Sequence, residues 1–110
     1  LEFLSLNLPN TSPDQFSKIF SNLSNLEFLN LYEINIHDLS FASSLRKLNS
    51  LKIWKSNLTT ISEIMSKELQ YLEVSHTFVP PKELIEYKKK YPNCEVVSFT
   101  GAEKGSQDIR

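Results

Sequence analysis

One leucine spacing recurs through most of this chain. The pattern L-x-x-L-x-L occurs at Leu26/Leu29/Leu31, Leu48/Leu51/Ile53 and Leu69/Leu72/Val74, less purely at Tyr91/Cys94/Val96, and it opens at Leu1/Leu4/Leu6. The first residues of these units are 25, 22, 21 and 22 positions apart. A motif that recurs at this period is typical of a solenoid, in which each unit forms one coil and stacks on the next. The sequence therefore predicts about four or five stacked coils.

The repetition extends beyond the three leucine positions. Apolar residues at Leu23, Leu26, Leu29, Leu31, Ile34, Ile36 and Leu39 recur as Leu45, Leu48, Leu51, Ile53, Ser56, Leu58 and Ile61. In this pattern residues 1–99 resemble the leucine-rich repeat family, in its class of short repeats of about 22 residues. The closing Tyr91-Pro92-Asn93-Cys94 also resembles the last coil of many members. The resemblance implies an α/β solenoid with short parallel strands on a concave face and short helices and turns on the convex side.

One departure from the family pattern concerns the turn after each strand. The usual Asn, whose side chain bonds the backbone of that turn, is replaced by Pro9, Ile34, Ser56, Thr77 and Phe99. Ser56 and Thr77 still offer a hydroxyl to the turn, whereas Asn10, Asn35 and Asn57 lie one place late. We therefore expect no buried asparagine ladder and less regular coils.

The period also predicts the secondary structure. Strands of about three to five residues should be parallel and centred near Ser5, Asn30, Lys52, Glu73 and Glu95. A capping box at Ser12-Pro13-Asp14-Gln15 predicts a helix to about Phe20, with Phe16, Ile19 and Phe20 inward. A second helix is predicted over 81–90, with Leu84, Ile85 and Tyr87 packing inward. Residues 41–45 and 61–66 are expected to form single turns.

The two ends of the chain differ from the middle. Leu1 lies inside a repeat with no polar cap before it. Because terminal coils must shield the core from water, we expect the chain to be the C-terminal part of a longer solenoid, or its first coil to pack on missing repeats or a second copy. Residues 100–110 contain both glycines and mostly polar residues, and they predict a flexible tail after a repeat domain over 1–99.

Composition excludes several classes of partner. A net charge of −1 provides no field to recruit nucleic acid or an acidic membrane, and no apolar run approaches the roughly 18 residues of a spanning helix. The lone Cys94 excludes an intrachain disulfide and favours a reducing compartment, so we predict a cytoplasmic location. Three glycosylation sequons, at Asn10, Asn22 and Asn57, point weakly the other way, and whether they are used stays open.

The residue types that carry catalysis are sparse. Glycine occurs only at positions 101 and 105, so no phosphate-binding loop is expected inside the fold. His37 and His76 lack ligand-spaced partners, and Cys94 occupies an inward leucine position, where a thiol is inert. Lys88 to Lys90 are interpreted as a solvated helix end, and Glu83 and Glu86 as helix-surface residues without a pocket. The sequence therefore predicts no enzyme activity, no metal and no cofactor.

The outward strand positions are more informative. Alternation places the side chains between and after the leucines on the open face of the strands. The aligned columns are Phe3, Phe28, Ser50, Tyr71 and Asn93; Ser5, Asn30, Lys52, Glu73 and Glu95; Asn7, Tyr32, Trp54, Ser75 and Val97; and, flanking them, Leu8, Glu33, Lys55, His76 and Ser98. Tyr32 and Trp54 should be direct neighbours, partly exposed and surrounded by charged residues.

Large amphipathic rings within a charged rim are typical of protein interfaces. We therefore predict that the concave face binds a protein or peptide through Phe28, Tyr32, Glu33, Lys52, Trp54, Lys55, Tyr71 and Glu73. Cross-strand stacking that only stabilises the sheet is the structural alternative, most fitting for Phe3 and Phe28. The chain is thus interpreted as a non-catalytic interaction module. The alternatives are the C-terminal recognition or sensor part of a multidomain enzyme or effector with its catalytic domain upstream of residue 1, and a purely structural array.

Overall fold

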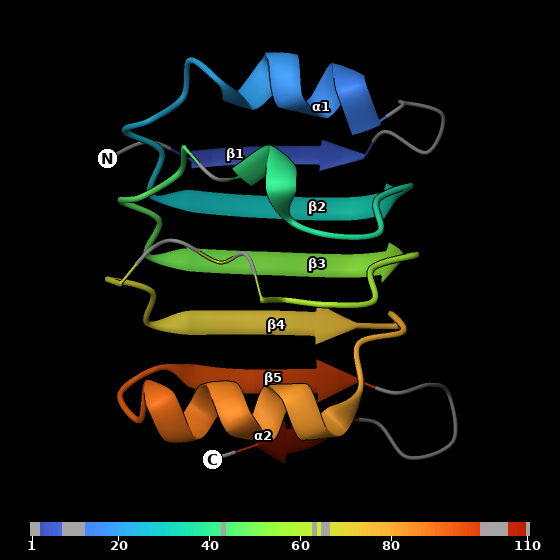
Figure 1. Cartoon of the computed structure of the whole chain (residues 1–110), viewed down its shortest axis with the longest axis vertical. Coiled ribbons are helices and arrows are strands. Elements are labelled where there is room, and N and C mark those ends of the chain that lie inside the picture. The colour runs from blue at the N-terminus through green and yellow to red at the C-terminus, as the bar shows by residue number, and fades with distance from the viewer. Residues whose placement is uncertain are drawn as a thin grey trace.

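Parallel strands dominate this small α/β domain. The computed structural model describes residues 3–7, 13–42, 44–62, 64, 67–99 and 106–109. Its sheet has the strand order β1-β2-β3-β4-β5-β6, so neighbours in the sequence are also neighbours in the sheet (Figure 1). The strands are β1 (Phe3–Asn7), β2 (Phe28–Ile34), β3 (Ser50–Ser56), β4 (Tyr71–Ser75), β5 (Glu95–Phe99) and β6 (Ser106–Ile109). Strands β1 to β5 pair in parallel, and β6 pairs antiparallel with β5.

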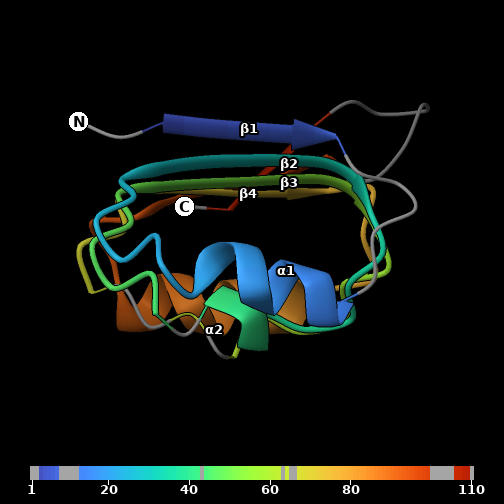
Figure 2. The same cartoon turned by 90° about the horizontal axis from the view of Figure 1, so that it is seen from above.

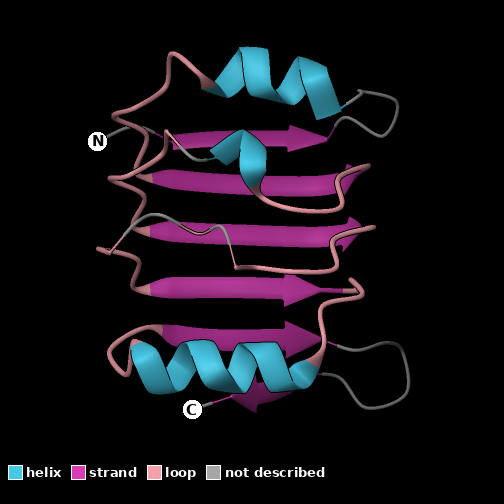
Figure 3. Ribbon diagram, in the orientation of Figure 1, coloured by secondary structure: helices cyan, strands magenta, loops and turns pink. Residues whose placement is uncertain are grey.

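The helices lie together on one face of the sheet. They are α1 (Pro13–Phe20), the 3₁₀-helix η1 (Ser40–Ala42) and α2 (Pro81–Lys90), and Figure 2 shows all three beneath the strands. Across the described segments, no helix covers the other face (Figure 3). None of the helices in these segments has the length and apolar character required to cross a membrane.

The core lies between the sheet and the helices. Leu29, Leu51 and Leu72 stand opposite one another in register, and all three are essentially inaccessible to solvent. The same is true of Leu31, Ile53 and Val74 two residues later. This confirms the predicted inward face, because a strand that alternates sides sends every second residue into the core. Leu4 and Leu6 of β1 are only partly buried against this core.

Successive units are also joined outside the strands. At the starts of the strands, hydrogen bonds run from Asn49 N to Glu27 O (2.7 Å), from Gln70 N to Asn49 O (2.8 Å) and from Glu95 N to Gln70 O (2.8 Å). Beyond the ends of the strands, they run from Thr59 N to His37 O (2.9 Å) and from Phe78 N to Leu58 O (2.9 Å). Backbone groups in the connections would otherwise lack partners where they are shielded from water. Backbone hydrogen bonds therefore join successive connections on both sides of the strands.

The last parallel strand departs from the predicted alignment. Leu72 and Glu73 pair with Val96 and Val97, whereas the leucine spacing aligned them with Cys94 and Glu95. The cause is the turn after α2, in which Cys94 N donates to Tyr91 O (3.0 Å) and delays the start of β5. A shift of two residues keeps every side chain on its predicted face. Cys94 is buried, as expected, although it lies just before the strand.

The predicted C-terminal tail is wrong for the part that the structure describes. Ser106–Ile109 form β6, which pairs antiparallel with β5 from Val96↔Ile109 to Phe99↔Ser106. A free edge of β5 would leave a row of backbone donors and acceptors unpaired, and a returning strand satisfies them without needing apolar side chains. Polar composition therefore did not signal this strand.

The helix predictions are confirmed in position and only partly in orientation. Phe20 and Leu84 are buried and Tyr87 packs partly against the core, but Ile19 and Ile85 are 40% and 45% exposed. Consecutive side chains on a helix point about 100° apart. When Phe20 and Leu84 face the core, Ile19 and Ile85 therefore point away from it. The side chain of Phe16, and residue Ser12 of the capping box, lie outside the described parts. Of the turns, η1 falls near the predicted 41–45. In the second predicted segment Ile64 N donates to Ile61 O (3.2 Å), the bond of a single turn, although residues 61, 62 and 64 are not part of a helix.

The hydroxyls predicted to bond the turns after β3 and β4 do so. Ser56 Oγ accepts from Leu58 N (3.0 Å) and donates to Ile36 O (3.4 Å), and Thr77 Oγ1 accepts from Val79 N (3.5 Å). The displaced asparagines pair with each other instead, since Asn57 Nδ2 donates to Asn35 Oδ1 at 2.8 Å on the surface. Short side chains thus brace the turns after β3 and β4.

Candidate protein-binding face

The candidate site is the side of the sheet that carries no helix in the described segments, which we call the strand face. It is formed by the outward side chains of β1 to β5. These are Phe3, Ser5, Asn7, Phe28, Asn30, Tyr32, Ser50, Lys52, Trp54, Tyr71, Glu73, Ser75, Glu95 and Val97. Asn93, which the sequence placed in the first column, precedes β5 and lies outside this set.

Aromatic side chains run across the strand face. Tyr32 and Trp54 are direct partners in the β2–β3 register, as predicted, and both are half-buried. Phe28 and Tyr71 are half-buried in the same way. Phe3 is 62% exposed, with its ring centroid 6.4 Å from that of Phe28. Part of each ring therefore remains available to a ligand.

The largest difference from the sequence-based prediction is the burial of Glu73. It was expected on an exposed charged rim, yet only 4% of it is exposed. Its carboxylate accepts hydrogen bonds from Trp54 Nε1 and Tyr71 Oη, and Ser75 Oγ donates to Oε2 at 3.4 Å. The completely buried Ser75 was likewise expected to face solvent. A buried carboxylate requires such donors, so Glu73 serves as a support for two rings rather than as a rim charge.

Trp54 is fixed from two sides. Its indole N–H is bound to Glu73, and its ring lies 4.9 Å from the His76 ring, centroid to centroid, at 56°. His76 had been assigned no role from the sequence, although its column beside Trp54 is the signal that would have suggested this contact. Loss of the indole would leave the Glu73 carboxylate short of a donor, which costs about 1–3 kcal/mol. Trp54→Ala should therefore lower the stability of the fold, whereas truncation of a fully exposed ring would leave it unchanged.

The rim of the strand face follows the ends of β2, β3 and β4. Glu33 and Lys55 are exposed there, as predicted, and His76 is half-buried. All three have positive φ, of 53°, 56° and 55°. In β2 and β3, Glu33 and Lys55 turn the chain. The residues that follow them, Ile34 and Ser56, therefore still pair with each other and remain buried. The repeat thus places oppositely charged Glu33 and Lys55 next to one another.

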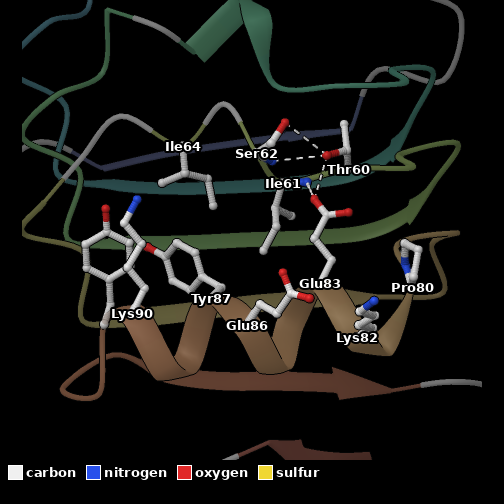
Figure 4. A pocket seen from close by; sticks show the side chains of 11 residues that line it. Thr60, Ile61, Ser62, Ile64, Pro80, Lys82, Glu83, Glu86, Tyr87 and Lys90 are labelled. Atoms are coloured by element: carbon white, nitrogen blue, oxygen red, sulfur yellow. Dashed lines mark hydrogen bonds between the residues drawn. The ribbon is translucent and has the colours of Figure 1, made fainter.

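A pocket lies on the opposite, helical side of the sheet. It encloses about 540 Å³ between α2 and residues 60–62 and 64 (Figure 4), and Glu83, Glu86 and Tyr87 contribute to its lining. Glu83 Oε1 accepts from Ile61 N (2.6 Å) and from Thr60 Oγ1 (2.5 Å). This corrects the expectation that these carboxylates lie on a helix surface without a pocket. Burial raises the pKa of the Tyr87 phenol above its ordinary value.

The remaining residues with reactive or metal-binding side chains form no cluster in the described segments. Within the segments that the structure describes, no group of three or more His, Cys, Asp or Glu residues could hold a metal ion. Cys94 is 1% exposed, and burial raises the pKa of its thiol to about 11, although the Lys88 ammonium opposes the shift. Lys88, interpreted from the sequence as solvated, in fact donates to Pro92 O and Cys94 O, both at 2.6 Å.

Comparison with known proteins adds no assignment. No protein-family model matches the sequence, and no curated protein matches it either.

Proposed function

We propose that this chain is a leucine-rich-repeat-type solenoid whose strand face binds a protein or peptide partner without catalysing a reaction. The proposal is supported by equivalent leucines in register on β2 to β4 and by repeated backbone bonds between successive connections. Extended surfaces of this kind serve recognition in repeat proteins. The proposed contact residues are Phe28, Tyr32, Glu33, Lys52, Trp54, Lys55 and Tyr71, with Glu73 acting from below the surface.

One observation carries the proposal: in a half-buried pair of neighbouring aromatic residues, the Trp54 ring is fixed by contacts within the protein before any partner arrives. Tyr32 and Trp54 are adjacent in register, and Trp54 is fixed by Glu73 and His76. A fixed ring loses little conformational entropy on binding, so more of its contact energy appears as affinity. Stacking alone would stabilise the sheet without requiring a buried carboxylate to orient the indole. The arrangement therefore favours binding over a purely structural role.

The test is selection of random linear peptides displayed on phage against the immobilised protein. Selected peptides are then titrated in solution while the emission of Trp54, the single tryptophan, is recorded. Binding should shift that emission to the blue, because interface centres exclude water. Tyr32→Ala should weaken binding by about tenfold or more, the loss expected at a hot spot.

Phe78→Ala is the matched control, because Phe78 is 70% exposed and lies outside the strand face. It should leave the affinity within about twofold, and both variants should retain the thermal midpoint of the wild type to within a few degrees. Failure to recover any peptide whose binding depends on Tyr32 would contradict the proposed function.

A further inference from the structure

Two polar side chains at the centre of the strand face have no hydrogen-bond or ion-pair partner among the described residues. Asn30 and Lys52 are directly opposite in the β2–β3 register, and both are half-buried. No hydrogen bond or ion pair joins either side chain to another of the described residues. Neighbouring strands lie about 4.8 Å apart, so donors on both can reach a single acceptor group.

Glu73 does not neutralise Lys52, although the two are register partners. The Glu73 oxygens accept instead from Tyr71, Trp54 and Ser75. Lys52 as a residue is half-buried beside this carboxylate, yet no described residue accepts a hydrogen bond from its ammonium. Near a protein surface the effective dielectric constant is lower than in bulk water, which strengthens the attraction of a cation there to a further anion.

Lys52 is the one cation among the outward strand positions of the strand face named above. Among the outward positions of β1, β2 and β3, Lys52 carries the single formal charge. At the adjoining rim Glu33 and Lys55 offset each other. Glu95 lies on the same face but two strands away from Lys52, on β5. Glu73, the register partner of Lys52 on β4, carries the nearest opposite charge, so the region around the aromatic pair has no net formal charge and the attraction for an anion is local to Lys52.

We infer that the strand face selects an acidic peptide segment, and that one Asp or Glu carboxylate of the partner binds between Lys52 and Asn30. A carboxylate offers two acceptor oxygens, which matches an ammonium and an amide donor side by side. The neighbouring Tyr32 and Trp54 rings, with Phe28 on the other side of Asn30 along β2, are placed to contact apolar residues that flank the acidic one. The inference rests on the proposed function and specifies its ligand.

The test repeats the phage selection with three proteins: the wild type, Lys52→Glu and Lys89→Glu. Lys89 is exposed on α2, on the opposite side of the sheet, so its variant matches the charge change without touching the strand face. The wild type and Lys89→Glu should enrich Asp and Glu next to aromatic or aliphatic residues. Lys52→Glu should lose that enrichment and favour Lys and Arg. Thermal melts confirm that both variants fold.

A selected acidic peptide then provides the quantitative measurement. Replacing its conserved Glu by Gln should weaken binding about tenfold or more, and so should Lys52→Glu in the protein. Combining Lys52→Glu with a peptide that carries Lys at that position should restore most of the affinity. Asn30→Ala should produce a smaller loss, of about threefold to tenfold.

The outcomes separate the two proposals. Peptides that require Tyr32 but show no acidic preference, or bind equally well after Glu→Gln, would overturn the carboxylate site and leave the proposed function standing. Absence of any Tyr32-dependent peptide would overturn both.

Discussion

Left-handed backbone conformation recurs at Glu33, Lys55 and His76 although none of them is glycine. For a residue with a Cβ this conformation costs roughly 1–2 kcal/mol, and β-branched side chains suffer most. The cost is offset here because the turn allows Ile34 and Ser56 to pair with each other at the ends of β2 and β3. Backbone geometry thus constrains which side chains the rim of the strand face can carry.

Lys55→Val should therefore destabilise the fold by about 1–2 kcal/mol, measured by urea denaturation. Lys52→Val is the matched control, since Lys52 lies in extended strand three residues earlier. Valine suits a strand, so the control should change stability by no more than about 0.5 kcal/mol. Equal losses in the two variants would contradict the left-handed assignment at position 55.

The buried thiol of Cys94 predicts a specific dependence on pH. Its pKa is raised from 9.0 to about 11, chiefly by burial. As the pH rises through this interval, the unfolded chain releases the thiol proton while the folded chain retains it, so stability falls between about pH 9 and pH 11. A shift of one unit corresponds to about 1.4 kcal/mol, so a shift of about two units makes a loss of the order of 3 kcal/mol.

Cys94→Ala should lack this part of the pH dependence. The difference between the two proteins in free energy of unfolding, measured at each pH, separates the contribution of the thiol from that of lysines and tyrosines. In the wild type at pH 8, a bulky thiol reagent should react slowly with the folded protein and rapidly in denaturant. Rapid labelling under native conditions would show that the thiol is accessible.

Among the elements, α2 is attached to the sheet by two charged side chains. Glu83 binds Thr60 and Ile61, in the connection that follows β3, and Lys88 binds the carbonyls of Pro92 and Cys94 in the turn before β5. Both contacts join the helix to segments that would otherwise leave backbone groups unpaired. The Lys88 contacts also lie in the turn between Tyr91 and Cys94, which precedes the first residue of β5.

Lys88→Met should destabilise the protein by about 1–2 kcal/mol, because two carbonyls lose a charged donor. Lys89→Met serves as control, since Lys89 has the same chemistry one residue later and is exposed. Its effect should stay within about 0.5 kcal/mol in the same urea titration. If the two variants unfold together, the Lys88 contacts contribute nothing to the closing turn.

Across the entire domain, stability depends on the shared row of inward leucines. Leu51 is buried between Leu29 and Leu72, so Leu51→Ala should cost about 2–5 kcal/mol, which is much of the stability of a domain this small. The adjacent Lys52→Ala should cost no more than about 0.5 kcal/mol. Circular dichroism melts of both variants would check this, and similar midpoints would mean that the inward face is assigned wrongly.

The leucine spacing was sufficient to predict strands β1 to β5, their parallel order and their inward residues, but not β6. Equal spacing places Leu29, Leu51 and Leu72 in phase, and alternation then assigns every neighbouring side chain to one face. The positions of α1 and α2 followed from capping and proline signals. Of the candidate site, the adjacency of Tyr32 and Trp54 followed from the same phase.

Other features depend on contacts that no local pattern encodes. Glu73 is buried because Trp54, 19 residues earlier, donates to it, and the helical pocket exists because Glu83 reaches back 22 residues to Ile61. The register of β5 depends on a turn beside α2, and β6 depends on an edge that only the folded sheet presents. Periodicity specifies the direction and phase of each side chain, whereas the partner it meets is set by packing between distant segments.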